Sequence, residues 1–177
     1  MTRKGWTFSL LPLVPLLIVA AYLVSVVVSH GGTQAGPIDI RSSGPTFTTF
    51  TELAGASDRV VLGEVVSIEH GRTITDPTDP TAGITTQLAT VATTQIAKGV
   101  PASTLVVEQE ASLLDGTPIT VDGVAPLRVG ATGWFFLIDG DGEQFPYTAL
   151  TAPESFVPAD SPEGDQVETL VTGEQFG

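Results

Sequence analysis

The residues best suited to chemistry are three acidic side chains that alternate with glycine in Asp139-Gly140-Asp141-Gly142-Glu143. Carboxylate oxygens are the ligands that Ca²⁺ prefers, and the ion takes about six to eight oxygens. The pattern therefore makes Asp139, Asp141 and Glu143 a candidate calcium site. A calcium-binding EF-hand loop needs a longer ligand set and a glutamate at a fixed distance, which this stretch lacks. The same residues are also typical of a tight, solvated hairpin, which is the interpretation we favour.

Nucleophilic hydrolysis is poorly supported by the remaining chemistry-bearing residues. A Ser-His-Asp site needs a histidine within reach of a serine, and the chain has only His30, in a Gly-rich segment, and His70, at the end of a predicted strand. No G-x-S-x-G elbow surrounds a serine, and the absence of cysteine removes thiol nucleophiles and Cys-ligated metals. We therefore expect no enzymatic activity and no cofactor, and keep an envelope hydrolase using paired carboxylates as the catalytic alternative.

An uninterrupted apolar segment near the start of the chain indicates a membrane anchor. Residues 6–28, from Trp6 to Val28, contain no ionisable side chain, and a helix of that length crosses the roughly 30 Å hydrocarbon core of a bilayer. Arg3 and Lys4 precede it, so the positive-inside rule places residues 1–5 in the cytoplasm and the rest outside. A cleaved signal peptide is the alternative, which would make the protein secreted, but its apolar region is normally shorter.

The part of the chain that follows the anchor is strongly acidic. Two of the seven basic residues precede the anchor, which leaves five against 20 acidic residues, a net charge of −15. Such a surface argues against binding nucleic acid or anionic lipid through bulk electrostatics and fits a soluble extracytoplasmic module. The aromatic residues that an oligonucleotide-binding barrel would use for stacking fall instead on predicted core strands: Trp134, Phe135, Phe136, Phe145 and Tyr147. We expect these five to pack in the core.

Residues beyond the anchor predict an all-β domain with one short helix. Residues 29–46 are rich in Gly, Ser, Thr and Pro and are predicted to form a flexible stalk. Thr49 and Glu52 match a capping box at the start of a short helix, with Gly55 at its C-terminal cap. Strands are then expected, in chain order, over residues 59–69, with a bulge or sharp bend at Gly63, and over 84–97, 105–110, 134–138, 146–150 and 155–157.

The connections between these strands carry turn residues. Residues 71–83 contain two Asp-Pro pairs and are predicted to be a loop. The proposed domain spans residues 47–158, and residues 159–177 form an acidic tail that either adds an edge strand or stays disordered. The number and spacing of the strands favour a small barrel, with a β-sandwich as the alternative.

The order of these features resembles the netrin-module and tissue-inhibitor-of-metalloproteinase-like group of OB barrels. The resemblance covers about residues 50–150 and rests on SDRVVLGEVVSI, a Thr/Val strand ending in IAKG, LVVEQE, and a Leu127-x-x-Gly130 turn before GWFFL. It implies an OB-like, five- to six-stranded, partly open β-barrel. The eukaryotic inhibitors of that group bind the zinc of their target through an N-terminal cysteine, and this chain has no cysteine to do so.

The sequence thus predicts a single-pass membrane protein that displays a small acidic barrel outside the cell. The expected function is non-catalytic binding of an envelope or secreted protein. Residues 6–28 are expected to anchor the chain in the membrane. A calcium-responsive surface module that uses the acidic hairpin is the alternative.

Overall fold

The computed structural model describes residues 36–142 and 147–173. The predicted anchor at residues 6–28 and the cytoplasmic tip at residues 1–5 lie outside the described residues. Within the described ranges, no helix is long and apolar enough to cross a membrane.

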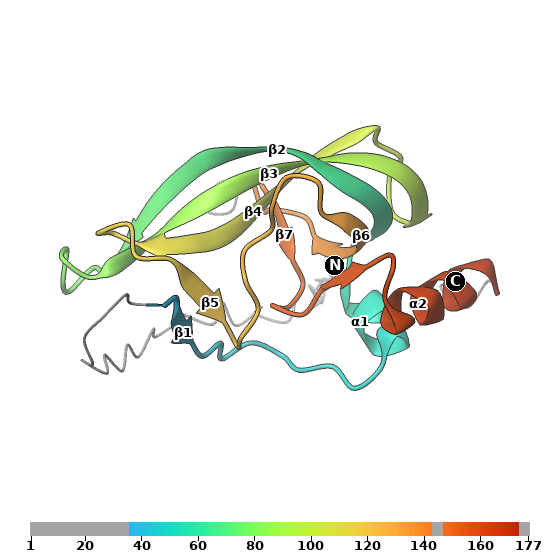
Figure 1. Ribbon diagram of the computed structural model, residues 1–177, viewed down its shortest axis with the longest axis horizontal. Coiled ribbons are helices and arrows are strands. Elements are labelled where there is room, and N and C mark those ends of the chain that lie inside the picture. Colours follow the sequence, from blue (N-terminus) through green and yellow to red (C-terminus); the bar gives the residue numbers. More distant parts are fainter. Residues whose placement is uncertain (1–35, 143–146, 174–177) are drawn as a thin grey trace, which may run out of the picture.

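A single six-stranded sheet dominates the protein, in agreement with the predicted all-β fold (Figure 1). Its strands, in sheet order, are β2 (Arg59–Thr75), β3 (Gly83–Lys98), β4 (Thr104–Leu113), β7 (Thr148–Leu150), β6 (Thr132–Ile138) and β8 (Phe156–Pro158). β2 also pairs with β6, so five of these strands, β2, β3, β4, β7 and β6, close into a ring. The pairing between β4 and β7 is parallel, and all other pairings in this sheet are antiparallel.

The aromatic strand β6 lies in the core, as expected, but its side chains divide between two core clusters. Successive side chains on a strand point to opposite faces, so Phe135 and Leu137 pack inside the ring while Trp134 and Phe136 pack outside it. The inner core also contains valines of β2, β3 and β4. The outer core is covered by residues of helices α1 (Phe50–Ala56) and α2 (Pro162–Thr172). β6 is therefore buried on both faces.

The long β2–β3 ribbon is bent by irregularities that the glycines allow. The register shifts between Leu62 and Gly63, which confirms the predicted bulge. A Cβ atom at Gly63 would lie 2.7 Å from the carbonyl oxygen of Ala92, so the neighbouring strand needs glycine there. The predicted loop over residues 71–83 is shorter than expected, because β2 continues to Thr75 and β3 begins at Gly83.

The first helix confirms the predicted capping box. The side chain of Thr49 accepts from the backbone N–H of Glu52, and Glu52 accepts from the backbone N–H of Thr49. Gly55 does not form the cap. The helix continues to Ala56 and is capped by Ser57, whose hydroxyl donates to the carbonyl of Leu53.

The acidic C-terminal segment contains a helix, so the prediction of an edge strand or disorder is wrong. Ser161 accepts from the backbone N–H of Gly164, and Pro162 occupies the first turn of α2, where its missing N–H costs no hydrogen bond. Val167 is fully buried against the outer core. Burial of one apolar face therefore orders this helix despite its acidic composition.

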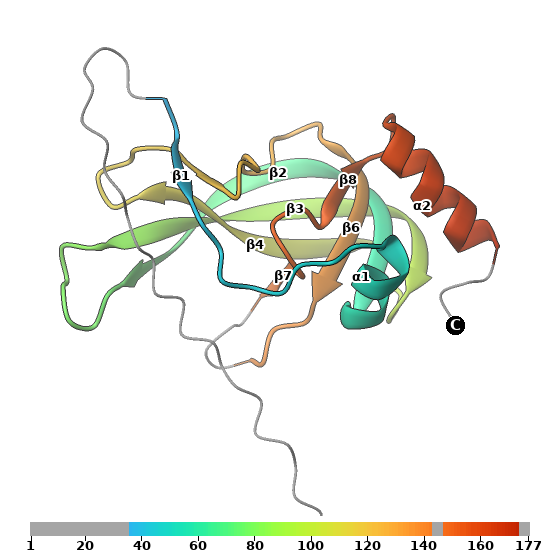
Figure 2. The same ribbon diagram turned by 90° about the horizontal axis from the view of Figure 1, so that it is seen from below.

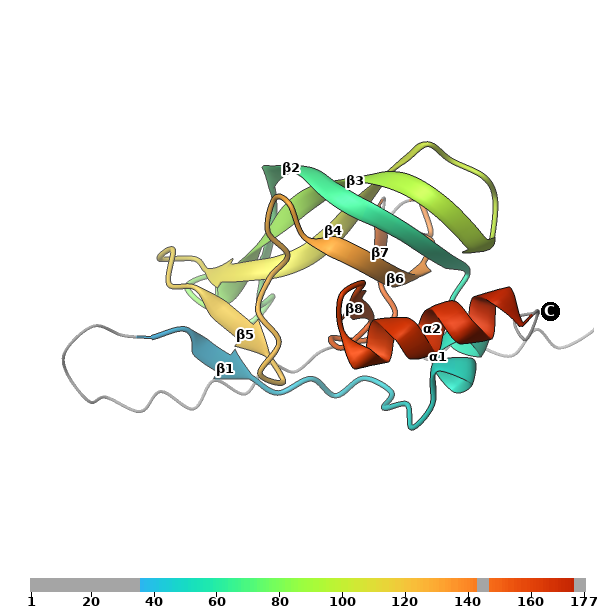
Figure 3. The same cartoon turned by 45° about the vertical axis from the view of Figure 1, so that its right-hand side comes forward.

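Part of the predicted flexible stalk is a strand. β1 (Ile38–Ile40) pairs in parallel with β5 (Ile119–Val121), and Figures 2 and 3 show β1 at the opposite end of the molecule from α2. Ile40 and Ile119 are buried together with Ile84 of β3. Asp39 accepts hydrogen bonds from the backbone N–H of Gly123 and the hydroxyl of Thr120, which lower the pKa of its carboxyl. The expected stalk is thus held against the body at these three residues.

Candidate functional site

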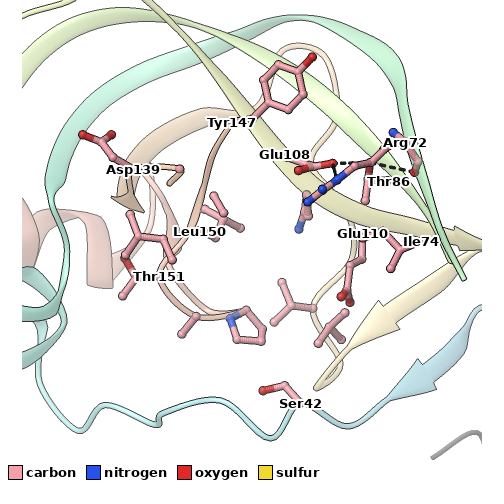
Figure 4. Close-up of a pocket in the computed structure, with 18 of the residues that line it drawn as sticks. Ser42, Arg72, Ile74, Thr86, Glu108, Glu110, Asp139, Tyr147, Leu150 and Thr151 are labelled. Carbon is pink, nitrogen blue, oxygen red and sulfur yellow. Dashed lines mark hydrogen bonds and ion pairs between the residues drawn. The ribbon is translucent and has the colours of Figure 1, made fainter. Parts of the chain in front are cut away.

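A groove of about 350 Å³ opens beside β4, next to the loop that joins β6 to β7 (Figure 4). β4 and β7 pair only through Val107 with Thr148 and Glu108 with Ala149. Because this seam is so short, side chains from both faces of β4 reach the groove, Gln109 from one face and Glu108 and Glu110 from the other. The apolar side chains of its lining include Ile74, Val121, Val124, Ile138, Leu150 and Pro153.

One wall of the groove is a buried polar network that joins three strands. Arg72 Nε on β2 donates to Glu108 Oε1 on β4 over 2.8 Å. The hydroxyl of Thr86, on the intervening β3, donates to the same oxygen over 2.8 Å and accepts from the backbone N–H of Arg72. The Glu108 side chain is only 8% exposed, so water is largely excluded from it. Its negative charge is compensated instead by the ion pair with Arg72. This network gives the groove wall a fixed shape.

Glu110 is different, because its carboxylate has no hydrogen-bond or ion-pair partner in the part of the chain that the structure describes. It lies two residues after Glu108 and on the same face of β4. Figure 4 shows its side chain pointing into the groove, away from the Arg72–Glu108 pair. Burial raises the pKa of the Glu110 carboxyl, since desolvation disfavours the charged form. Among the described residues of the groove, Glu110 is therefore an acid without a partner, and a positive group would compensate its charge.

Two of the three candidate calcium residues, Asp139 and Asp141, line the groove. Asp139 binds Arg59 through both carboxylate oxygens, at 2.5 and 2.9 Å, and its backbone N–H donates to Asp58. Asp141 lines the groove, and Glu143 lies outside the described residues. Within residues 36–142 and 147–173, no group of three or more acidic or histidine side chains is arranged to hold a metal ion. A calcium ion at Asp139 would have to compete with the Arg59 guanidinium.

The aromatic residues divide between the core and the groove. Trp134, Phe135 and Phe136 are buried, as predicted. Phe145 lies outside the described residues. Tyr147 was expected in the core, but it is 37% exposed and lines the groove, because β7 begins only at Thr148.

The one histidine within the described ranges, His70, does not line the groove. His30 lies outside the described residues, and His70 is an exposed residue of β2 that is not part of the groove lining. Its Nδ1 atom lies 3.0 Å from the carbonyl oxygen of the adjacent Gly71.

No protein family profile matches this chain, and no curated protein is significantly similar to it in sequence. The groove is therefore the feature of this chain that indicates its function. Sequence reasoning missed Arg72, Glu108 and Glu110 as site residues. The available signal was the alternation of Glu108 and Glu110 in a strand, which places two acids on one face of a sheet.

Proposed function

We propose that this chain is a membrane-anchored, extracytoplasmic and non-catalytic binding module that contacts an envelope or secreted protein through the groove beside β4. The observation that carries the proposal is the groove: a concave, largely apolar surface with a few convergent polar groups is the usual form of a binding site. The apolar residues 6–28 support the anchor, and the charge of −15 on the remainder supports solubility outside the cell.

We also propose that the ring of five strands is an OB-like barrel of the kind seen in the netrin-module group. The sheet order β2-β3-β4-β7-β6, its closure through β2 and β6, and the short parallel seam between β4 and β7 support this interpretation. OB barrels bind ligands on the face of their second and third strands and on the loop between the fourth and fifth. In this chain those elements are β3, β4 and the β6–β7 connection, all of which contribute to the groove.

Two of the four carboxylates that line the groove are held in ion pairs, which supports binding over catalysis. Glu108 is held by Arg72 and Thr86, and Asp139 is held by Arg59. Acids fixed in this way act as structural groups, whereas acid–base hydrolysis needs two carboxyls that are free to exchange protons at the bond to be cleaved.

Crosslinking in intact cells of the source organism tests the proposal. A photoreactive phenylalanine analogue replaces Tyr147 in the groove, and a matched control replaces Val66, which is 48% exposed on β2 and does not line the groove. We expect one dominant envelope or secreted protein to be captured from position 147 and not from position 66. The captured protein, once purified, must bind the wild-type chain and lose affinity for Tyr147→Ala. Equal capture from both positions contradicts the proposal.

A further inference from the structure

We infer that the groove selects a partner segment carrying a basic side chain between apolar ones, and that Glu110 is the carboxylate that receives the basic group. This inference rests on the proposed function, because it names the chemistry of the protein that the groove would bind.

The charges around the groove single out Glu110. Arg72 is paired with Glu108, and the carboxylate of Asp139 is occupied by Arg59. Asp141 also lines the groove and is not without a partner. Glu110 has no hydrogen-bond or ion-pair partner among the described residues, although it points into the cavity. An incoming ammonium or guanidinium group would provide the charge-assisted hydrogen bond that the fold itself does not supply.

The surroundings of Glu110 would make a hydrogen bond from an incoming cation stronger than the same bond in open water. Ile74 and Leu150 line the same groove, so the carboxylate is partly shielded from solvent. Shielding raises the pKa of Glu110 and makes its ionised form unfavourable without a partner. A cation in the groove would offset the free-energy cost of ionising Glu110. A neutral ligand would leave that cost unchanged, and an anion would add repulsion.

The apolar lining and the size of the groove define the remainder of the segment. A volume of about 350 Å³ accommodates a few side chains and not a folded domain. Val121, Val124 and Leu150 offer contacts to the apolar neighbours of a basic residue. The net charge of −15 outside the anchor also attracts a basic partner at long range.

Fluorescence anisotropy with labelled model peptides tests the inference on the full chain in lipid nanodiscs, with empty nanodiscs as the blank. The probes are acetyl-Val-Lys-Val-amide and the same peptide with Nε-acetyllysine, which keeps the shape and loses the charge. We expect the lysine peptide to bind at least about tenfold more tightly, the effect of one charge-assisted hydrogen bond. The Glu110→Gln variant should bind both peptides equally and weakly.

A matched variant separates local recognition from general attraction. Glu168→Gln removes the same charge from an exposed position of α2, outside the groove, and should leave the preference for lysine unchanged. As a second measurement, lowering the pH through the raised pKa of Glu110 should abolish the preference in the wild-type chain, because the protonated carboxyl no longer attracts a cation.

The outcomes distinguish this inference from the proposed function. Equal binding of both peptides, with weaker binding to Tyr147→Ala, would overturn the role of Glu110 while leaving the groove as a binding site. Loss of lysine preference in Glu168→Gln, or no binding of either peptide, would also overturn the inference. The crosslinking comparison of positions 147 and 66 decides the proposed function independently.

Discussion

Arg72 Nε lies 2.8 Å from Glu108 Oε1, and this ion pair links β2 to β4 across the whole width of β3. Thr86 of β3 donates to the same carboxylate oxygen, so the three strands share one polar contact. The pair forms one wall of the groove, whereas Glu110, two residues along β4, has no such partner among the described residues.

Removal of one member of this pair should destabilise the protein more than removal of both. Arg72→Met leaves the Glu108 carboxylate, only 8% exposed, without its cation, and we expect a loss of about 1–3 kcal/mol in the free energy of unfolding. The double variant Arg72→Met/Glu108→Gln should recover part of that loss, since no uncompensated charge remains. Urea denaturation of the full chain measures the free energy of unfolding of the wild type, the two single variants and the double variant, which together form a double-mutant cycle. Strictly additive losses would show that the pair is not coupled.

Glu110→Gln should stabilise the protein at neutral pH. The folded-state pKa of Glu110 is raised by burial, so its ionised form opposes folding above that pKa, and the penalty disappears below the unfolded value near 4.5. The variant should therefore unfold at higher urea concentration than wild type at pH 7 and at the same concentration at pH 4. A gain that persists unchanged at pH 4 would indicate a cause other than the charge.

Two glycine substitutions should change the stability of the fold in opposite directions. Gly133 of β6 packs against β8 so closely that a Cβ atom would collide with the backbone carbonyl of Val157, and Gly133→Ala should cost about 1–3 kcal/mol. Gly55 lies within α1 and has no atom near its Cβ position, so Gly55→Ala should gain roughly 0.5–1 kcal/mol through helix propensity. Thermal unfolding of both variants provides the comparison, and a melting temperature lowered in both would refute it.

Ile40→Ala should release β1 without unfolding the ring. Ile40 belongs to a small cluster with Ile84 and Ile119, separate from the two main cores. Truncation should cost about 2 kcal/mol locally. Amide hydrogen exchange should then accelerate at Ile38, whose N–H donates to the carbonyl of Pro118, and remain slow in β6. Faster exchange throughout β6 would show that β1 is part of the global folding unit.

The strands of the ring were predictable because their signals are local. The density of Val and Ile predicted β2 and β3, and Gly63 predicted the bulge in β2. Thr49 and Glu52 predicted the start of α1. β1 was missed because its three residues pair with a strand some 80 positions away, and nothing in a Gly- and Ser-rich segment reveals that partner.

The groove could not be predicted for the same physical reason. Arg72, Glu108 and Leu150 meet only after three strand pairings fix their register, and a shift of one residue would turn each side chain to the opposite face. The second helix, in contrast, was signalled by Ser161 and Pro162, whose types favour a helix start, but an acidic composition obscured it.

If the chain is anchored as proposed, the pairing of β1 with β5 would limit how far the domain can move from the membrane. In the proposed anchored form, only residues 29–37, nine in all, connect the membrane segment to the first fixed residue, Ile38. Fully extended, they span roughly 30 Å. Ser42 lies just beyond β1 and lines the groove. The groove would therefore stay close to the bilayer surface. In that proposed form, confinement would raise the effective concentration of the groove for neighbours in the same membrane and lower it for proteins farther from the membrane.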